Sequence, residues 1–498
     1  MGSSVKRLFS LVLVLRATTA FAEPGRLVQD TWNAAYLGGA KAGYVHTSVR
    51  EIEQDGKKLF RTLTELQLTV MRESEPITLR METGSDETAD GIVTRVTMRQ
   101  FLGKQQQLVL TGTVEQGQLR VQVDGGKRQD KRIPWNDQVI GLYRQERQFQ
   151  ERGVKPGDRF NYLSYEPTIN SVINTRVSVK DYEAVGVEGK KQQLLRVEAV
   201  PDKIGGLQLP TLVSWLNSDR ETLRSEVPGP GLGKMVLERT SQKNATRRGS
   251  AATVAGINAL VPLNQPIRNP YRTRAAVYRV VLKDDNEPTT AFKQDGRQQI
   301  KNVEGNSFEL HVQAAQTGDK ARKGEPIGDE FLASSFFINS DDARVKRRAS
   351  EAVGDTQDSW EKALRIESYV HSQMVNKNLT EAFATADQVA KTMEGDCTEH
   401  AVLAAAMCRA VGVPSRTAIG LVYVDHPRRG PCMGFHMWTE VWVDGAWTPI
   451  DATLGMGYVG AAHIKITDHS WHKTESLTPL LPVLRVLDKL SIDVVRAQ

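Results

Sequence analysis

Residues 395–416 read GDCTEHAVLAAAMCRAVGVPSR and residues 434–453 read GFHMWTEVWVDGAWTPIDAT, and these two stretches decide the fold of the C-terminal part. The first predicts a helix that begins at Cys397 and stops at Gly412, because glycine commonly ends a helix. The second holds two alternating segments joined by Asp444-Gly445, which is typical of a two-residue β-hairpin. A helix followed by antiparallel strands indicates an α+β domain.

The same stretches place a cysteine, a histidine and an aspartate in the chain order of papain-type chemistry. The thiolate is the reactive form of cysteine, and both a helix N-terminus and a nearby imidazolium favour it. We therefore expect Cys397 to be the nucleophile, with its own N–H forming half of an oxyanion hole. His436 is expected to act as base and later as acid, and Asp451 to fix the tautomer of the histidine.

The hairpin also predicts which side chains meet. If residues 444–445 form the turn, Trp438 lies opposite Asp451, and His436 becomes the diagonal neighbour of Asp451. Diagonal Cβ atoms are about 7 Å apart, which lets a carboxylate and an imidazole share a hydrogen bond. The other ring nitrogen of His436 should then point towards Cys397. A bulge of one residue would turn Asp451 to the opposite face and destroy the pair.

These motifs resemble the core of the transglutaminase-like superfamily. Its usual pattern is a Gly-x-Cys helix ending in Gly-[IV]-Pro-x-Arg, then His-x-Trp-x-Glu, a further Trp, and Asp-x-Thr. The resemblance implies a catalytic triad of Cys397, His436 and Asp451. The sequence departs from the pattern at Met437, where Ala is common, and at Ala452, where Pro is common, and neither change removes a reacting group. The resemblance implies nothing about the first half of the chain.

Several neighbours of these motifs have more than one interpretation. Trp438 packs in the core or lines the acyl-binding site, and we include it as a candidate substrate-binding residue. Glu440 is expected to be structural, and Arg416 to pack or pair near the end of the helix. His400 follows Cys397 by one helical turn, but the second pair of ligands that a zinc site needs is missing.

The chain has only three cysteines, which excludes a secreted scaffold built from disulfides. Cys408 lies 11 residues after Cys397, about 16 Å further along the helix axis, so the two cannot bridge. Cys408 lies on an apolar stripe and is expected in the core. Cys432 takes no part in the chemistry, or it forms a reversible disulfide with Cys397.

Composition and the N-terminus indicate an exported globular protein. The 498 residues are 40% apolar and 25% charged, which excludes a disordered or collagen-like chain. Residues 1–22 are typical of a secretory signal, with the basic pair Lys6-Arg7, the apolar run 8–15 and a small-residue end at 20–22. A buried helix or a membrane anchor is the alternative, but a span needs about 20 apolar residues.

We therefore expect a periplasmic or secreted protein with no integral membrane segment once the signal is removed. Removing residues 1–22, which carry three basic residues and no acidic one, lowers the formal net charge from +6 to +3. Nothing in this charge argues for nucleic acid as a partner.

The first half is predicted to be an antiparallel β-rich domain over residues 23–240, because short segments alternate polar and apolar residues. Alternating segments occur at 59–71, 77–81, 92–98, 108–114, 119–123, 159–165, 175–179 and 193–200. Residues 32–44 weakly resemble exported bacterial domains with a curved antiparallel sheet, which implies a concave surface for a lipid or a peptide. A structural or docking module is the alternative.

The whole chain is thus predicted to be a multidomain α+β protein. A linker is expected at 241–272, a small β subdomain at 273–341, and a transglutaminase-like catalytic domain, papain-like in its triad, at 342–498.

The resemblance implies a cysteine enzyme that forms an acyl-thioester on Cys397 from a peptide or glutamine amide. Transfer of the acyl group to water would make it a hydrolase, and transfer to an amine an acyltransferase. We expect a peptide or protein substrate, no cofactor, and no required metal, since no acidic cluster resembles a calcium loop. The alternative is a non-catalytic envelope protein, for binding or structure, with an inert transglutaminase-like domain. The sequence leaves the oligomeric state open.

Overall fold

A computed structural model gives the structure of the protein. The described residues are 25–72, 75–101, 107–124, 129–204, 208–229, 233–247, 249, 252–253, 260–314, 327–376, 383–472, 474 and 478–498. The expected signal segment at 1–22 lies outside them. Within these ranges, no helix has both the length and the apolar composition needed to cross a bilayer.

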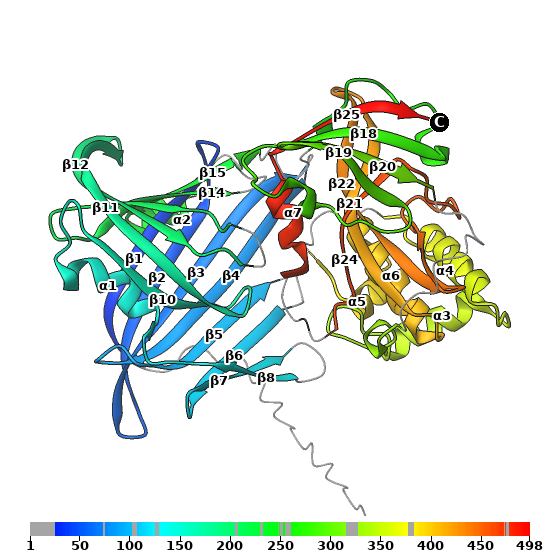
Figure 1. The fold of residues 1–498 in the computed structure, drawn as a ribbon. Coiled ribbons are helices and arrows are strands. Elements are labelled where there is room, and N and C mark those ends of the chain that lie inside the picture. The colour runs from blue at the N-terminus through cyan, green and yellow to red at the C-terminus, as the bar shows by residue number, and fades with distance from the viewer. Residues whose placement is uncertain are drawn as a thin grey trace, which may run out of the picture.

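A 16-stranded sheet contains most of the described residues between 26 and 253 and fills one side of the molecule in Figure 1. Its strands run in the order β8-β7-β6-β5-β4-β3-β2-β1-β15-β14-β13-β12-β11-β10-β9, with β16 beside β3. The strands are β1 (Arg26–Leu37), β2 (Ala40–Gln54), β3 (Lys57–Arg72), β4 (Glu75–Thr88), β5 (Val93–Phe101), β6 (Gln107–Glu115), β7 (Gln118–Asp124), β8 (Gln129–Pro134), β9 (Val139–Ile140), β10 (Arg159–Glu166), β11 (Ser171–Val187), β12 (Lys190–Pro201), β13 (Leu212–Leu216), β14 (Thr222–Gly229), β15 (Gly233–Thr240) and β16 (Ala252–Thr253). All neighbours are antiparallel except β9–β10 and β16–β3, which confirms the predicted antiparallel β-rich half.

Local turn chemistry explains why consecutive strands pair. Asp55 and Gly56, which join β2 to β3, have φ angles of 53° and 71°. Gln116 and Gly117, which join β6 to β7, have φ angles of 51° and 71°. Two successive residues in the left-handed region form the turn whose twist matches that of the flanking strands. These short connections fix the register of each hairpin.

Helix α1 (Leu142–Arg152) was not predicted from the sequence. Its sequence, LYRQERQFQER, has too few apolar residues to show a clear helical period. The buried carboxylate of Glu87 on β4 accepts hydrogen bonds from the N–H groups of Tyr143 (2.8 Å) and Arg144 (3.2 Å). The first turn of the helix is thereby tied to the sheet.

The segment expected as a linker carries short elements that attach it to both parts of the chain. Helix α2 (Gln242–Thr246) contacts β1 and β2, and β16 pairs with β3. Strand β17 (Val261–Pro262) pairs instead with β22 of the C-terminal part, and the 3-10 turn η1 (Pro270–Arg272) follows it.

A four-stranded sheet has the order β19-β20-β18-β25. Three of its strands come before the transglutaminase-like motifs in the sequence, and β25 comes after them. Its strands are β18 (Ala275–Leu282), β19 (Gln298–Glu304), β20 (Ser307–Gln313) and β25 (Leu490–Ala497), and the 3-10 turns η2 (Pro288–Ala291) and η3 (Asp329–Phe331) lie before and after β19 and β20. The last strand of the chain therefore belongs to the same sheet as residues 275–313. The boundary expected at residue 341 assigns these two segments to different domains. Figure 1 shows β25 beside β18.

The remaining C-terminal part has helices on one side of a second sheet, which confirms the predicted α+β class (Figure 1). These helices are α3 (Ala343–Val353), α4 (Ser359–Gln373), α5 (Ala386–Thr392) and α6 (Cys397–Ala410). Helix α7 (Leu481–Val486), which follows the 3-10 turn η4 (Thr478–Leu480), lies apart from them and contacts β24 and η2 (Figure 1). The sheet runs β17-β22-β21-β24, with β23 also beside β22. Its longer strands are β21 (Ser415–His426), β22 (Gly430–Val443), β23 (Ala446–Ile450) and β24 (His463–His469). Helix α6 contacts α3, α4 and α5 as well as β21 and β22, so it forms the centre of the core.

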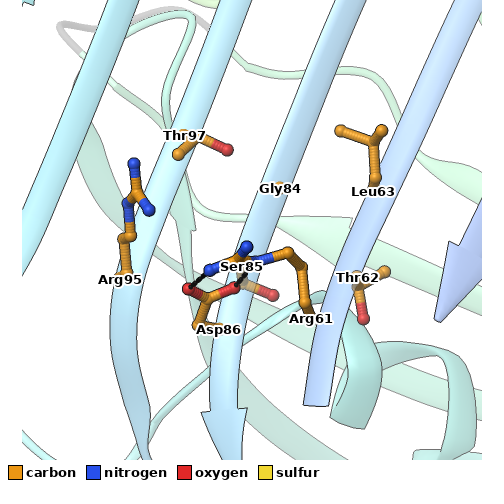
Figure 2. Close-up of a pocket in the computed structure, with 8 residues that line it drawn as sticks. All are labelled: Arg61, Thr62, Leu63, Gly84, Ser85, Asp86, Arg95 and Thr97. Atoms are coloured by element: carbon orange, nitrogen blue, oxygen red, sulfur yellow. Dashed lines mark hydrogen bonds and ion pairs between the residues drawn. The ribbon is translucent and has the colours of Figure 1, made fainter. Parts of the chain in front are cut away.

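Figure 2 shows a small cavity on the large sheet, between β3, β4 and β5. Arg61 forms a bidentate ion pair with Asp86 beside it, with both N–O distances at 2.7 Å. The cavity has a volume of 20 Å³, enough for about one water molecule. It is too small for a substrate, and its lining comes from residues 61–97, far in sequence from the cysteine motif.

Candidate active site

The candidate site begins at the N-terminus of helix α6, where Cys397 is the first helical residue. The Asp396 carboxylate accepts a hydrogen bond from the N–H of Thr398 (2.8 Å), and the N–H of Asp396 donates to the carboxylate of Glu399 (3.0 Å). This reciprocal capping box fixes the start of the helix. Gly395 has a φ of +147°, and a Cβ there would lie 2.3 Å from the Cβ of Glu399, so only glycine fits.

Cys397 differs from the other two cysteines in its access to solvent. It is half-buried, whereas Cys408 and Cys432 are buried, and all three are free thiols. Burial raises the pKa of Cys408 to about 12 and also raises the pKa of Cys432. The predicted core position of Cys408 is thereby confirmed. Among the described residues, the N–H of Cys397 has no hydrogen-bond acceptor, as the first turn of a helix allows.

The hairpin β22–β23 has the predicted register without a bulge. Asp444 and Gly445 form the turn, with φ angles of 52° and 80°. The paired residues are Val443–Ala446, Trp442–Trp447, Val441–Thr448, Glu440–Pro449 and Thr439–Ile450. Asp451 follows the last of these pairs directly, so its side chain stays on the face that carries His436.

His436 and Asp451 are in contact, as the register predicts. Nε2 of His436 lies 2.8 Å from Oδ2 of Asp451, and both side chains are almost fully buried. Burial disfavours the charged imidazole, but the charges of Asp451 and Cys397 outweigh it and hold the pKa of His436 well above its usual range. That the second ring nitrogen of His436 faces Cys397 stays a prediction.

Further contacts hold Asp451 in place. Its Oδ1 accepts from the N–H of Thr453 (2.9 Å), and its own N–H donates to Oε1 of Glu367 (3.0 Å). Its Oδ2 accepts a second imidazole hydrogen bond, from Nε2 of His463 (3.0 Å). Burial opposes ionisation of this carboxyl, but His436 and His463 outweigh it and hold the pKa of Asp451 far below its usual range.

Sequence reasoning missed both Glu367 and His463. Glu367 lies on α4 beside Ala363, Ile366 and Val370, all of them buried, so an acidic residue on an apolar helix face was the available signal. Burial raises the pKa of Glu367 to about 7. His463 begins β24, and no motif in the sequence marks it. Burial lowers its pKa.

Trp438 packs against the imidazoles. It is 1% exposed, its ring is stacked near that of His436 with centroids 6.3 Å apart, and it meets His463 edge-on at 5.5 Å. This position favours packing, one of the two roles expected for Trp438, and its contact with a substrate stays a prediction.

Arg416 and Glu440 belong to a buried ionic network beside the site. Arg416 contacts the carboxylates of Glu440 (2.7 Å) and Asp468 (3.0 Å), and Nζ of Lys465 lies 3.0 Å from Glu440 and also pairs with Asp295. Burial opposes ionisation of Glu440, but Lys465 and Arg416 outweigh it and lower its pKa to about 2. The network joins β21, β22 and β24, in agreement with the structural roles expected for Arg416 and Glu440.

Potential metal ligands gather at one place among the described residues. One ligand atom each of His436, Asp451 and His463 lies within 4.8 Å of the other two. Hydrogen bonds account for this grouping, because both imidazoles contact the same carboxylate oxygen. His400 is not part of it, because its Nδ1 bonds the carbonyl oxygen of Asp396 (2.6 Å) within its own helix.

Comparison with known families identifies residues 346–452 as a transglutaminase-like domain, matching the core of the transglutaminase-like superfamily. The matched range contains Cys397, His436 and Asp451. No curated protein matches the chain.

Three solved structures are similar to parts of the chain. A "putative cysteine protease" from Cytophaga hutchinsonii is 16% identical, with 45% of this chain and 87% of that one covered and a TM-score of 0.30. A "beta-barrel-like protein" of a domain of unknown function from Brucella abortus is 15% identical, with 44% and 98% covered and a TM-score of 0.33. A "putative protease" from Parabacteroides distasonis is 11% identical, with 74% and 68% covered and a TM-score of 0.20.

Proposed function

We propose that the chain is an exported cysteine enzyme that forms an acyl-thioester on Cys397 from a peptide or glutamine amide. The observation that carries the proposal is the buried His436–Asp451 hydrogen bond beside Cys397 at a helix N-terminus. The match of residues 346–452 to the transglutaminase-like superfamily supports it. The secretory character of residues 1–22 supports export to the periplasm or beyond the cell.

In the first half-reaction, the thiolate of Cys397 attacks the carbonyl carbon of the amide and forms a tetrahedral intermediate. The N–H of Cys397 can donate to the oxyanion, because it has no other acceptor among the described residues. The imidazolium of His436 gives its proton to the leaving nitrogen, the carbon–nitrogen bond breaks, and the thioester remains. Asp451 keeps Nε2 protonated, so that Nδ1 exchanges the proton at the reacting atoms.

In the second half-reaction, His436 takes a proton from the incoming nucleophile, which attacks the thioester carbonyl. Water gives a carboxylic acid, and an amine gives a new amide, while the sulfur leaves as the thiolate and re-forms the pair with His436. Hydrolysis and transfer use the same residues, so both belong to the proposal.

Trapping the acyl-enzyme tests this function. The full chain is incubated with a library of glutamine-containing peptides, quenched in acid and measured by intact-protein mass spectrometry. We expect an adduct that maps to Cys397, is released by hydroxylamine and is absent from Cys397→Ala. A folded wild-type chain that forms no adduct under conditions in which a control cysteine hydrolase does would favour the inert-domain alternative, an envelope binding or structural protein.

A further inference from the structure

The Asp451 carboxylate is shared by two histidines, His436 and His463. Oδ2 accepts from Nε2 of His436 at 2.8 Å and from Nε2 of His463 at 3.0 Å. The rings of the two histidines approach edge to face, with centroids 5.9 Å apart. His463 therefore acts on the site through Asp451.

The register of three strands places His463 on the face of the sheet that carries His436. His463 on β24 pairs with Val422 on β21, which pairs with Gly434 on β22, so the three share a face of the sheet. Gly420 pairs with His436 in the neighbouring row.

The surroundings of His463 fix it as a hydrogen-bond donor. It is 2% exposed, and burial lowers its pKa, so the ring is neutral near pH 7. A neutral imidazole has one N–H, and the ionised Asp451 can only accept, so this proton lies on Nε2. Nδ1 is buried and has no hydrogen-bond partner among the described residues, which agrees with this tautomer.

We propose that His463 is a positioning residue of the candidate site, which holds Oδ2 of Asp451 against His436 and limits how strongly that carboxylate stabilises the imidazolium. This inference rests on the proposed function. Without the His463 donor, His436 alone would neutralise Oδ2, and the imidazolium would keep its proton to higher pH. The carboxylate would also lose one of the contacts that orient it, so Cys397 would react more slowly at neutral pH.

The test is the rate of Cys397 alkylation by iodoacetate, measured in the full chain by peptide mapping from acidic to alkaline pH. The imidazolium of His436 attracts this anion, so the rate falls at alkaline pH where His436 loses its proton. His463→Phe keeps a ring of similar size without a donor, whereas His463→Gln places an amide N–H near the position of Nε2. We expect His463→Phe to slow alkylation at neutral pH by about tenfold or more, the effect of losing a hydrogen bond to a charged group, and to move the alkaline limb of the profile to higher pH. His463→Gln should restore most of the rate and the wild-type limb. If His463→Phe fails to fold, His463→Asn replaces it, because its shorter amide does not reach Asp451.

Two results would overturn the inference. One is a folded donor-less variant with the wild-type rate and profile. The other is an equal loss in His463→Phe and His463→Gln with an unmoved alkaline limb, which would mean that His463 only fills space. A wild-type Cys397 that reacts no faster than a free thiol would instead contradict the proposed function, so the two failures are distinguishable.

Discussion

Nε2 of His436 lies 2.8 Å from Oδ2 of Asp451, although 14 residues and a hairpin turn separate the two in the chain. The contact exists because β22 and β23 pair without a bulge up to Thr439–Ile450. A shift of one residue would turn Asp451 to the other face of the sheet. The hairpin register is therefore what brings the acid to the base in the candidate site.

Asp451→Asn should disable the pair while leaving the fold intact. The amide cannot stabilise the imidazolium as a carboxylate does, and a neighbouring opposite charge shifts a pKa by about 1–3 units. We expect alkylation of Cys397 near neutral pH to slow by about 100-fold, since each unit is a factor of ten. Asp468→Asn is the matched control, because Asp468 pairs with Arg416 and should leave the rate per folded molecule unchanged. Equal rates in wild type and Asp451→Asn would contradict the role of Asp451.

The two cysteines of helix α6 should separate activity from stability. Cys397→Ala should abolish amide cleavage with little change in the free energy of unfolding, because Cys397 is only half-buried. Cys408→Ala should cost about 1–2 kcal/mol through a core cavity and keep the activity. Urea denaturation and an activity assay on both variants check this. Loss of activity in a fully folded Cys408→Ala chain would show the assignment to be wrong.

The ionic network should matter for stability alone. Glu440→Gln removes the charge that pairs with both Arg416 and Lys465, and breaking a buried pair costs about 3 kcal/mol or more. The double variant Glu440→Gln with Lys465→Gln should lose still more stability, because Lys465 also pairs with Asp295 and Asp468. Denaturation curves measure both effects. A Glu440→Gln chain as stable as wild type, or one folded with a much slower Cys397, would refute a purely structural role.

Glu367 should make stability fall as the pH rises. Its pKa is raised from 4.5 to about 7 by burial and by Asp451, so between these values the folded state binds more protons than the unfolded state. Glu367→Gln cannot ionise and keeps an oxygen for the N–H of Asp451. The free energy of unfolding of Glu367→Gln should exceed that of wild type by an amount that grows from near pH 4.5 to near pH 7. The difference should then level off at about 3 kcal/mol. Glu361→Gln, an exposed position on the same helix, should show no such gain in urea denaturation. If the free energies of unfolding of Glu367→Gln and wild type changed equally with pH, the raised pKa of Glu367 would be refuted.

The sequence predicted those parts of the site that depend on local pattern. The start of helix α6 at Cys397 and the turn at Asp444-Gly445 follow from capping and turn chemistry within a few residues. Given this register, the position of Asp451 relative to His436 follows from strand geometry alone.

The parts that depend on distant segments could not be predicted. His463 reaches Asp451 only because β24 lies beside β21, and Glu367 does so from α4, a distant helix. The return of β25 to β18 joins residues about 200 positions apart, and no local signal encodes that pairing. Helix α1 depends on its contacts with Glu87 on β4 rather than on an apolar period of its own.

The relative alkylation rates of the three cysteines in the native wild-type chain test the central claim most directly. Limiting iodoacetamide is added near neutral pH, and the label on Cys397, Cys408 and Cys432 is followed over time by peptide mass spectrometry. A thiolate held by His436 and Asp451 predicts that Cys397 reacts well ahead of both buried thiols and faster than free cysteine in the same buffer. Equal and slow labelling of all three cysteines, in a chain shown to be folded, would contradict the account.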